Sequence, residues 1–129
     1  MKLKFSEGVF ECIENPPQFF ASLGNLHDAT IISVARTAPG GVCFIIGDVF
    51  NNFVDFPEYP GEFGAAIILA GSTDCEWTVS ASHLFGKKIN DFEVFPAHSA
   101  DAKYRLEIAC HAMDRYVMNF DKAEIRIAR

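Results

Sequence analysis

The amino-acid sequence predicts a mainly β (α+β) fold, either an antiparallel β-sandwich or a partly open barrel of about seven or eight strands, with one short N-terminal helix. Three observations lead to this class. Apolar side chains recur with a period of two, which is the period of a strand that buries one face. About eight such segments follow one another at short spacing, with turn-forming residues between them. The long helices that a βαβ fold needs between its strands are missing from the pattern.

The first half of the chain contains the helix and the clearest hairpin. Two prolines at 16–17 precede the sequence QFFASLGN, so a helix of about two turns begins at the prolines and ends at 24–25. The run ATIISVAR, residues 29–36, is dense in β-branched residues and predicts a strand. A Pro-Gly pair at 39–40 suits a type II turn. This turn joins the first strand to a second one, VCFIIGDVF, at 42–50.

The second half of the chain is predicted to consist of strands. The segment 64–71, GAAIILAG, is apolar without alternation, as in a strand that is covered on both faces. The last two alternating segments, 116–120 and 124–127, have opposite phases, so 121–123 must hold a turn or bulge. Further strands are predicted at 76–81, at 89–95 before Pro96, and at 103–111, and Leu3 and Phe5 fit an edge strand.

Length and composition indicate one domain, residues 1–129, with an ample core. Half of the 129 residues are hydrophobic and 13% are aromatic, unlike the composition of a disordered chain. The N-terminal residues lack the apolar stretch of roughly 7–15 residues that a signal peptide needs. No window approaches the roughly 18 apolar residues of a membrane span. We therefore expect a soluble cytoplasmic protein that does not act on a membrane.

The four cysteines are spaced too widely for the usual zinc or redox motifs. No two of them form a CxxC pair. Two lie inside apolar runs, where a free thiol behaves as a small hydrophobic group. We expect reduced, buried thiols, and a disulfide between distant cysteines remains an alternative at this point. The four are Cys12, Cys43, Cys75 and Cys110.

The negative charge is concentrated in the middle of the chain. Residues 1–36 contain three Lys/Arg and four Asp/Glu, and residues 87–129 contain eight and seven. Residues 37–86 contain no Lys or Arg and six Asp/Glu, so they account for the whole net charge of −6, because the other two parts carry −1 and +1. Such a block repels phosphate backbones, which argues against a nucleic-acid partner. It would attract a basic protein surface or a cation.

The most unusual stretch, GDVFNNFVDFPEYPGEFG at 47–64, interleaves aromatic and acidic residues. Its two prolines prevent a central strand and predict a loop that presents Tyr59 between two carboxylates. Tyrosine is enriched at interface hot spots. The alternative is that the aromatics of this loop pack down on the sheet, and Val49, Phe53 and Val54 are expected to cover the core. The predicted partner-binding residues are Asp48, Asp55, Glu58, Tyr59 and Glu62.

The adjacent pair His27-Asp28 is the other candidate site. Neighbouring side chains of a strand point to opposite faces, so the pair could bind one ligand only if the strand begins at Ala29. The dense β-branched run also argues against the all-α phosphohydrolases that contain this dipeptide. We favour a structural role, in which Asp28 accepts hydrogen bonds from turn amides and His27 is partly buried with a satisfied ring. The alternative is a ligand site formed by His27, Asp28 and His83.

A family resemblance begins at the same residues. A short helix followed by Leu26-His27-Asp28-Ala29, opening onto a strand, a turn and a strand, resembles the start of several small bacterial families. Some of these are immunity proteins of toxin systems, and others have no assigned function. The match covers about residues 19–46, with a looser similarity in a final hairpin around YRLEIA and AEIRI. The resemblance implies a mostly-β cytoplasmic domain that binds a protein, and it supplies no catalytic residue.

Motifs for catalysis, cofactors or metals do not appear in the sequence. GxSxG, GxGxxG and GxxxxGK[ST] are missing, and no two of the four histidines have HxH, HxxxH or HExxH spacing. We therefore expect no cofactor, no metal site and no enzymatic activity. The leading hypothesis is a protein-binding domain for a basic partner such as a toxin. The alternatives are a small-molecule-binding domain or enzyme with a cleft near His27 and Asp28, and self-association of an otherwise monomeric chain through an edge strand such as 103–111.

Overall fold

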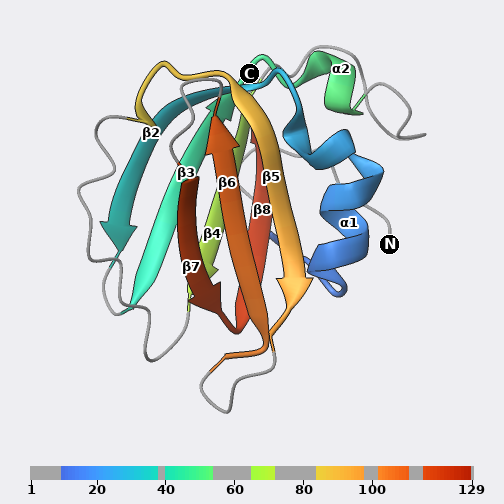
Figure 1. Ribbon diagram of the computed structural model, residues 1–129, viewed down its shortest axis with the longest axis vertical. Coiled ribbons are helices and arrows are strands. Elements are labelled where there is room, and N and C mark those ends of the chain that lie inside the picture. Colours follow the sequence, from blue (N-terminus) through green and yellow to red (C-terminus); the bar gives the residue numbers. More distant parts are fainter. Residues whose placement is uncertain are drawn as a thin grey trace.

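Two antiparallel sheets and a short helix form the architecture of the computed structural model (Figure 1). The residues that the structure describes are 10–37, 40–53, 65–71, 84–97, 102–110 and 115–128. The five-stranded sheet has the order β1-β8-β4-β3-β2, and the three-stranded sheet has the order β5-β6-β7. The strands are β1 (Glu11–Cys12), β2 (Thr30–Thr37), β3 (Gly41–Gly47), β4 (Ala65–Gly71), β5 (Ile89–Pro96), β6 (Tyr104–Cys110), β7 (Arg115–Phe120) and β8 (Lys122–Ala128).

The predicted helix is confirmed. Helix α1 (Pro16–Ser22) begins after Asn15, whose side chain accepts a hydrogen bond from the Gln18 amide at 3.4 Å. It is followed by a 3-10 helix, η1 (Gly24–Leu26). The sequence did not predict a second helix, α2 (Phe50–Phe53), because four residues are too few to show a helical period. No helix among the described residues has the length and apolar character required to cross a membrane.

The mainly β class and most of its strands are as predicted. Strands β2 and β3 form the expected hairpin, and Gly40 has the positive φ of 67° that a type II turn requires at this position. The strand predicted at 103–111 corresponds to β6 and that at 89–95 to β5. The predictions at 76–81 and at Leu3 and Phe5 lie outside the described residues.

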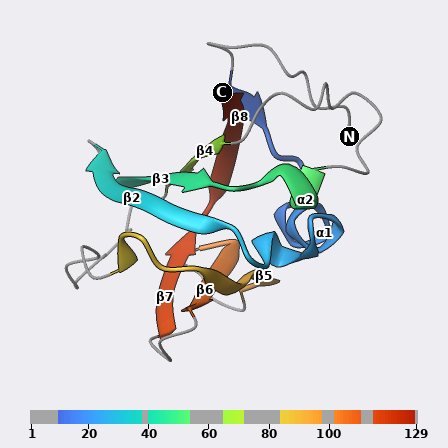
Figure 2. The same ribbon diagram turned by 90° about the horizontal axis from the view of Figure 1, so that it is seen from above.

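One shared core lies between the two sheets and the helix. The ring of Phe92 on β5 contacts Phe44 on β3, with centroids 5.4 Å apart, and Phe20 on α1 at 5.1 Å. All three side chains are at most 1% exposed. Figure 2 shows the two sheets as separate layers, with α1 beside them at one end. This burial of aromatic surface holds β3, β5 and α1 together.

The two sheets are joined at one corner by backbone hydrogen bonds between β2 and the start of β5. The Ile31 amide donates to the Lys87 carbonyl at 3.0 Å, and the Ile89 amide donates to the Ala29 carbonyl at 2.8 Å. An isolated bridge also pairs Thr30 with Lys88. The structure is therefore a sandwich whose two sheets are connected at this corner, which is the first of the two architectures that the sequence allowed.

Asp121 is the second joint between the sheets. On β7 the even-numbered residues 116, 118 and 120 are buried, whereas on β8 the odd-numbered residues 123, 125 and 127 are buried. The phase change predicted at 121–123 is therefore confirmed, and it marks the place where the chain leaves one sheet for the other. The Asp121 amide donates to the Gly71 carbonyl at 3.0 Å, and its carboxylate accepts from the Lys103 amide at 3.2 Å.

Two expectations about the last strands are wrong. YRLEIA belongs to β6 and AEIRI to β8, and these segments lie in different sheets, so they do not form a final hairpin. Residues 103–111 also do not supply an edge strand. β6 is the central strand of its sheet, and the two outer positions belong to β5 and β7. An alternating sequence shows that a strand has two faces but not how many neighbours it has.

Candidate functional site

The candidate site is the corner between η1 and β2, which we call the His27 corner and define as residues 25–28 with the groups that contact them. All the non-glycine residues with positive φ in the described parts of the chain lie in or beside it. They are Asn25 (52°), Leu26 (54°), Asp28 (67°) and Asp48 (57°). Asn and Asp tolerate this region, whereas Leu rarely does. Leu26 is held there by complete burial in the core.

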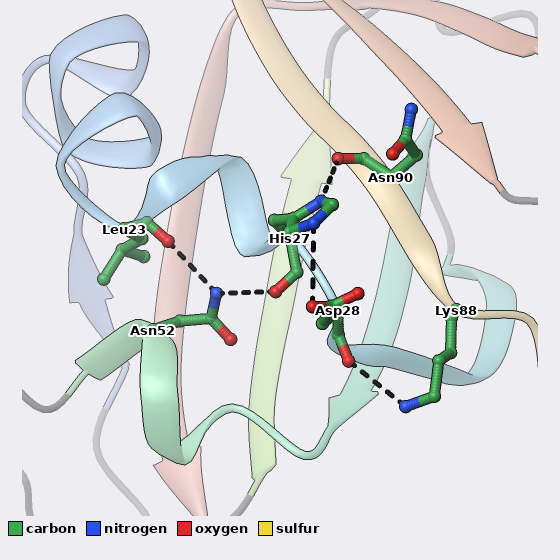
Figure 3. A network of polar contacts seen from close by, with 6 residues as sticks. All are labelled: Leu23, His27, Asp28, Asn52, Lys88 and Asn90. Atoms are coloured by element: carbon green, nitrogen blue, oxygen red, sulfur yellow. Dashed lines mark hydrogen bonds and ion pairs between the residues drawn. The ribbon is translucent and has the colours of Figure 1, made fainter.

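The backbone turn at Asp28 brings two neighbouring side chains to the same side. β2 begins at Thr30, so His27 and Asp28 precede the regular strand. The two side chains are therefore not forced to opposite faces of a strand, and they can act together. His27 Nε2 lies 3.6 Å from Asp28 Oδ2, and the two side chains are 55% and 62% exposed (Figure 3). The expectation of a partly buried His27 is wrong, because its ring projects from the corner into solvent.

The other ring nitrogen of His27 is anchored to β5. Nδ1 lies 2.9 Å from the Asn90 carbonyl oxygen. Because a carbonyl only accepts hydrogen bonds, Nδ1 must carry the proton and donate it. The Nε2 position is then the one that faces Asp28, and it becomes a second donor to that carboxylate when the ring is protonated. The ring is thus fixed in orientation by a contact 63 residues away in sequence.

Asn52 on α2 connects the His27 corner to the end of α1. Its Nδ2 donates to the Leu23 carbonyl at 3.2 Å and to the His27 carbonyl at 3.1 Å (Figure 3). Its Oδ1 is buried and has no hydrogen-bond partner among the described residues. On the other side, Lys88 Nζ donates to the Asp28 carbonyl at 3.4 Å. These contacts hold the backbone of the pair from two directions while both side chains stay accessible.

Asp48 is the one predicted partner-binding residue that the structure describes. It follows β3 and is exposed, and its Oδ2 accepts a hydrogen bond from Thr30 Oγ1 at 2.8 Å. Since Thr30 is the first residue of β2, Asp48 lies at the same end of the sheet as the His27 corner. The remaining predicted site residues, which are Asp55, Glu58, Tyr59, Glu62 and His83, lie outside the described residues, as does Val54. Val49 and Phe53 are fully buried, as expected.

The sequence analysis missed Asn52, Lys88 and Asn90. No local pattern could have identified them, because Asn52 comes from α2 and the other two from the start of β5, at long sequence separation from the corner. Among the described residues, no group of three or more His, Cys, Asp or Glu side chains gathers as a metal site would require.

The cysteines are less buried than expected. Cys12, Cys43 and Cys110 are free thiols, and only Cys110 is buried. Cys12 is exposed because β1 is at the sheet edge, and Cys43 is half-buried because it lies on the outer side of β3. Burial raises the pKa of the Cys43 thiol from its ordinary value, and the nearby Arg126 guanidinium offsets part of this rise. Cys75 lies outside the described residues.

Comparisons of the chain with protein-family models, curated proteins and solved structures found no match.

Proposed function

We propose that this chain is a non-enzymatic, cytoplasmic protein-binding domain whose acidic central segment binds a basic protein partner. The immunity protein of a bacterial toxin system is the concrete form of this proposal. The observation that carries it is the charge distribution, since residues 37–86 contain six carboxylates and no Lys or Arg. Charge complementarity of this kind accelerates association and makes it dependent on salt.

The placement of Asp48 supports the proposal. Its carboxylate is exposed at the end of β3 and is held in one orientation by the Thr30 hydroxyl. A charge fixed by a hydrogen bond loses less side-chain entropy when a partner binds than a free one does. The neighbouring Asp28 is also exposed, which adds a second carboxylate at this end of the sheet.

Neutralising the acidic segment tests the proposal. The variant with Asp48→Asn, Asp55→Asn, Glu58→Gln and Glu62→Gln keeps side-chain shape and removes four charges. Asn accepts a hydrogen bond and tolerates positive φ as Asp does, so the Thr30 contact survives. We expect association with a partner captured from the host, or with the product of the adjacent gene, to slow by at least about tenfold at low salt.

The matched control is Asp91→Asn, which removes an exposed carboxylate on β5 outside the acidic segment. This variant should bind as the wild type does. A partner that is acidic, or binding whose rate does not change with salt or with the four substitutions, would refute the proposal.

A second candidate function is the binding of a small polar molecule at the His27 corner. The observation that favours it is the convergence of His27 and Asp28 at 3.6 Å, with Lys88 anchored on the backbone of the same turn. Such a pair offers a ligand one nitrogen and one carboxylate from a preorganised turn.

Ring signals of His27 in NMR spectra would report such binding during titrations with Zn²⁺ and with a panel of small polar compounds. His27→Gln is the control, because it removes the imidazole and keeps a hydrogen-bonding side chain. If no compound perturbs the wild-type ring signals, or if His27→Gln binds equally well, this second function is discarded.

A further inference from the structure

The face of the five-stranded sheet that points away from the three-stranded sheet carries an unusual set of side chains. We call it the outer face. On β3, β4 and β8 every second residue is buried against the core, so the alternate residues point outward. The described side chains of the outer face on these three strands are the half-buried Cys43, Ile45, Ile67, Glu124 and Arg126 and the exposed Lys122.

The outer face also carries the most exposed large hydrophobic side chain that the structure describes. Ile32 lies at a bulge in β2 and is 51% exposed. Its Cδ1 lies 2.7 Å from the place that a Cβ on Gly47 would occupy, so Ile32 covers this glycine from outside. Together with Ile45 and Ile67 it makes the outer face largely apolar, which is the property of a surface that meets another protein.

The two half-buried charged groups of this surface have no ion-pair partner among the described residues. They are Glu124 and Arg126, which point outward from the same strand. Arg126 Nε is buried and has no hydrogen-bond acceptor in the described parts of the chain, and its guanidinium lies over the Phe10 ring at 5.3 Å. Buried donors nearly always have an acceptor. This Nε is therefore open to a carboxylate from another molecule.

Strand register shows which molecule could supply that carboxylate. Arg126 is level with Ile67 and Ile45, and Glu124 is level with the row that contains Cys43. A second copy can pack face to face with the first about a two-fold axis that lies between the sheets, perpendicular to the strands, at the level of Ile125. The strands of the second copy then run antiparallel to those of the first. Glu124 of each copy would then oppose Arg126 of the other, because a two-fold contact is self-complementary.

The same operation matches the remaining rows. The row of Cys43 opposes the apolar row of Ile45 and Ile67. The row of Gly47, which Ile32 covers, opposes the row of Gly41, Gly71 and Lys122, where the two glycines leave space over β3 and β4. Apolar groups meet apolar groups, and Ile32 meets the two glycines. Strand spacing of about 4.8 Å and a rise of about 3.4 Å per residue give four seven-residue strands a flat area of roughly 500 Å², close to one side of a small specific interface.

We propose that the outer face of the five-stranded sheet is the contact surface of a symmetric homodimer, with reciprocal Glu124–Arg126 ion pairs at its axis. This inference concerns residues other than the predicted partner-binding ones and does not depend on the proposed function. It also relocates self-association from a strand edge to a sheet face.

Charge reversal tests the reciprocal pairs. In Glu124→Arg each dimer would contain two Arg–Arg contacts, and in Arg126→Glu two Glu–Glu contacts. Each single variant should dimerise at least about a hundredfold more weakly than the wild type in analytical ultracentrifugation. An equimolar mixture of the two variants restores both opposite-charge contacts, so it should form a heterodimer. The double variant Glu124→Arg/Arg126→Glu should form a homodimer for the same reason.

Hydrophobic contact is tested by a matched pair of substitutions. Ile32→Lys should weaken the dimer, whereas Val117→Lys should leave it unchanged, because Val117 is 42% exposed on the outward side of the other sheet. Alkylation of Cys43, followed by peptide mass spectrometry, should slow as protein concentration rises through the dimerisation range.

Three results would overturn the proposal. The first is a wild-type chain that stays monomeric up to millimolar concentration. The second is a dimer that both single charge reversals leave intact. The third is a mixture of well-folded single variants, judged by circular dichroism, that fails to form the heterodimer.

Discussion

The charged side chains on the outward faces of the two sheets differ in whether they have ion-pair partners. On the three-stranded sheet, Glu107 contacts Arg115 at 3.1 Å and Arg105 at 3.7 Å, and the arginine side chains are 67% and 50% exposed. On the five-stranded sheet, Glu124 and Arg126 are both half-buried, and neither has an ion-pair partner among the described residues. A charge in water tolerates many arrangements, whereas a charge on an apolar surface needs a specific partner.

The difference indicates that the charges on the outward face of the three-stranded sheet are compensated within the chain, whereas those of Glu124 and Arg126 on the five-stranded sheet are not. Glu93 lies directly opposite Glu107 in the ladder, and the arginines flanking Glu107 compensate this like-charge contact. The three-stranded sheet therefore balances its own charges. The five-stranded sheet has an orphaned arginine donor instead, which is why we place the intermolecular contact there.

The largest expected effect concerns the core that both sheets share. Phe92→Ala removes the ring that contacts Phe44 of the other sheet and Phe20 of α1. It should lower the free energy of unfolding by about 3–5 kcal/mol, because it leaves a cavity between the sheets. Urea denaturation measures the change. Phe95→Ala, on the same strand but half-buried on the outward side, is the control and should cost well under half as much. Equal losses would mean that the two sides of β5 are packed alike.

The next effect distinguishes the unpaired arginine from a paired one. Arg126→Met keeps much of the aliphatic stem and removes the buried donor that lacks an acceptor. At concentrations where the chain is monomeric, it should raise stability by about 1 kcal/mol, because an unsatisfied buried donor costs about 1–3 kcal/mol. Arg105→Met is the matched substitution on the solvated face and should change stability by less than about 0.5 kcal/mol. A large loss of stability in Arg126→Met would show that its guanidinium is satisfied within the chain.

A smaller effect is expected at the paired carboxylate. Glu107→Gln weakens two exposed ion pairs, each of which contributes little in water. Stability should fall by less than about 1 kcal/mol, and the difference from the wild type should shrink at high salt. Thermal unfolding at low and high ionic strength measures both. A loss that is independent of salt would assign Glu107 a role in packing rather than in ion pairing.

The smallest effect is a change in thiol reactivity on the outer face. Burial raises the pKa of Cys43 above its ordinary value of 9.0, so less of this thiol should be ionised at neutral pH than of an unperturbed one. Its half-buried position also limits access, whereas Cys12 is exposed. Cys43 should react more slowly with iodoacetamide than Cys12, and Arg126→Met should slow it further because a nearby positive charge is lost. Since the folded protein holds this proton more tightly than the unfolded chain does, the corresponding stability is present at neutral pH. It is lost as the pH rises past 9.0 and through the higher folded pKa.

A slower reaction at Cys12 than at Cys43 would contradict this assignment. Peptide mass spectrometry separates the two sites, and Cys110, which is buried, serves as the unreactive reference.

Much of the fold could be predicted from local patterns. Alternation identified β6 and β7, and the phase reversal at 121–123 located the joint between the sheets. Prolines and the Gly-Asn pair located α1. The single turn of α2 was missed because four residues show no periodicity, and the edge strand was assigned wrongly because pairing is a non-local property.

The candidate sites were predicted less well. His27 and Asp28 were identified as a pair, but their convergence depends on the positive φ at Asp28 and on anchors from α2 and β5. Glu124 and Arg126 had no sequence feature that separated them from Arg105 and Glu107. Both pairs are alternate residues of amphipathic strands, and only the partners on neighbouring strands differ.

The sequence by itself determined which residues face inward, where the chain turns, and that the negative charge is concentrated between residues 37 and 86. These properties follow from backbone geometry and composition, which act within a few residues. Only the tertiary structure decided which strands are central, that the His27 ring is oriented by Asn90, and that Arg126 lacks an acceptor. The physical reason is that hydrogen-bond satisfaction and burial depend on what packs alongside, and these contacts join residues that are far apart in the chain.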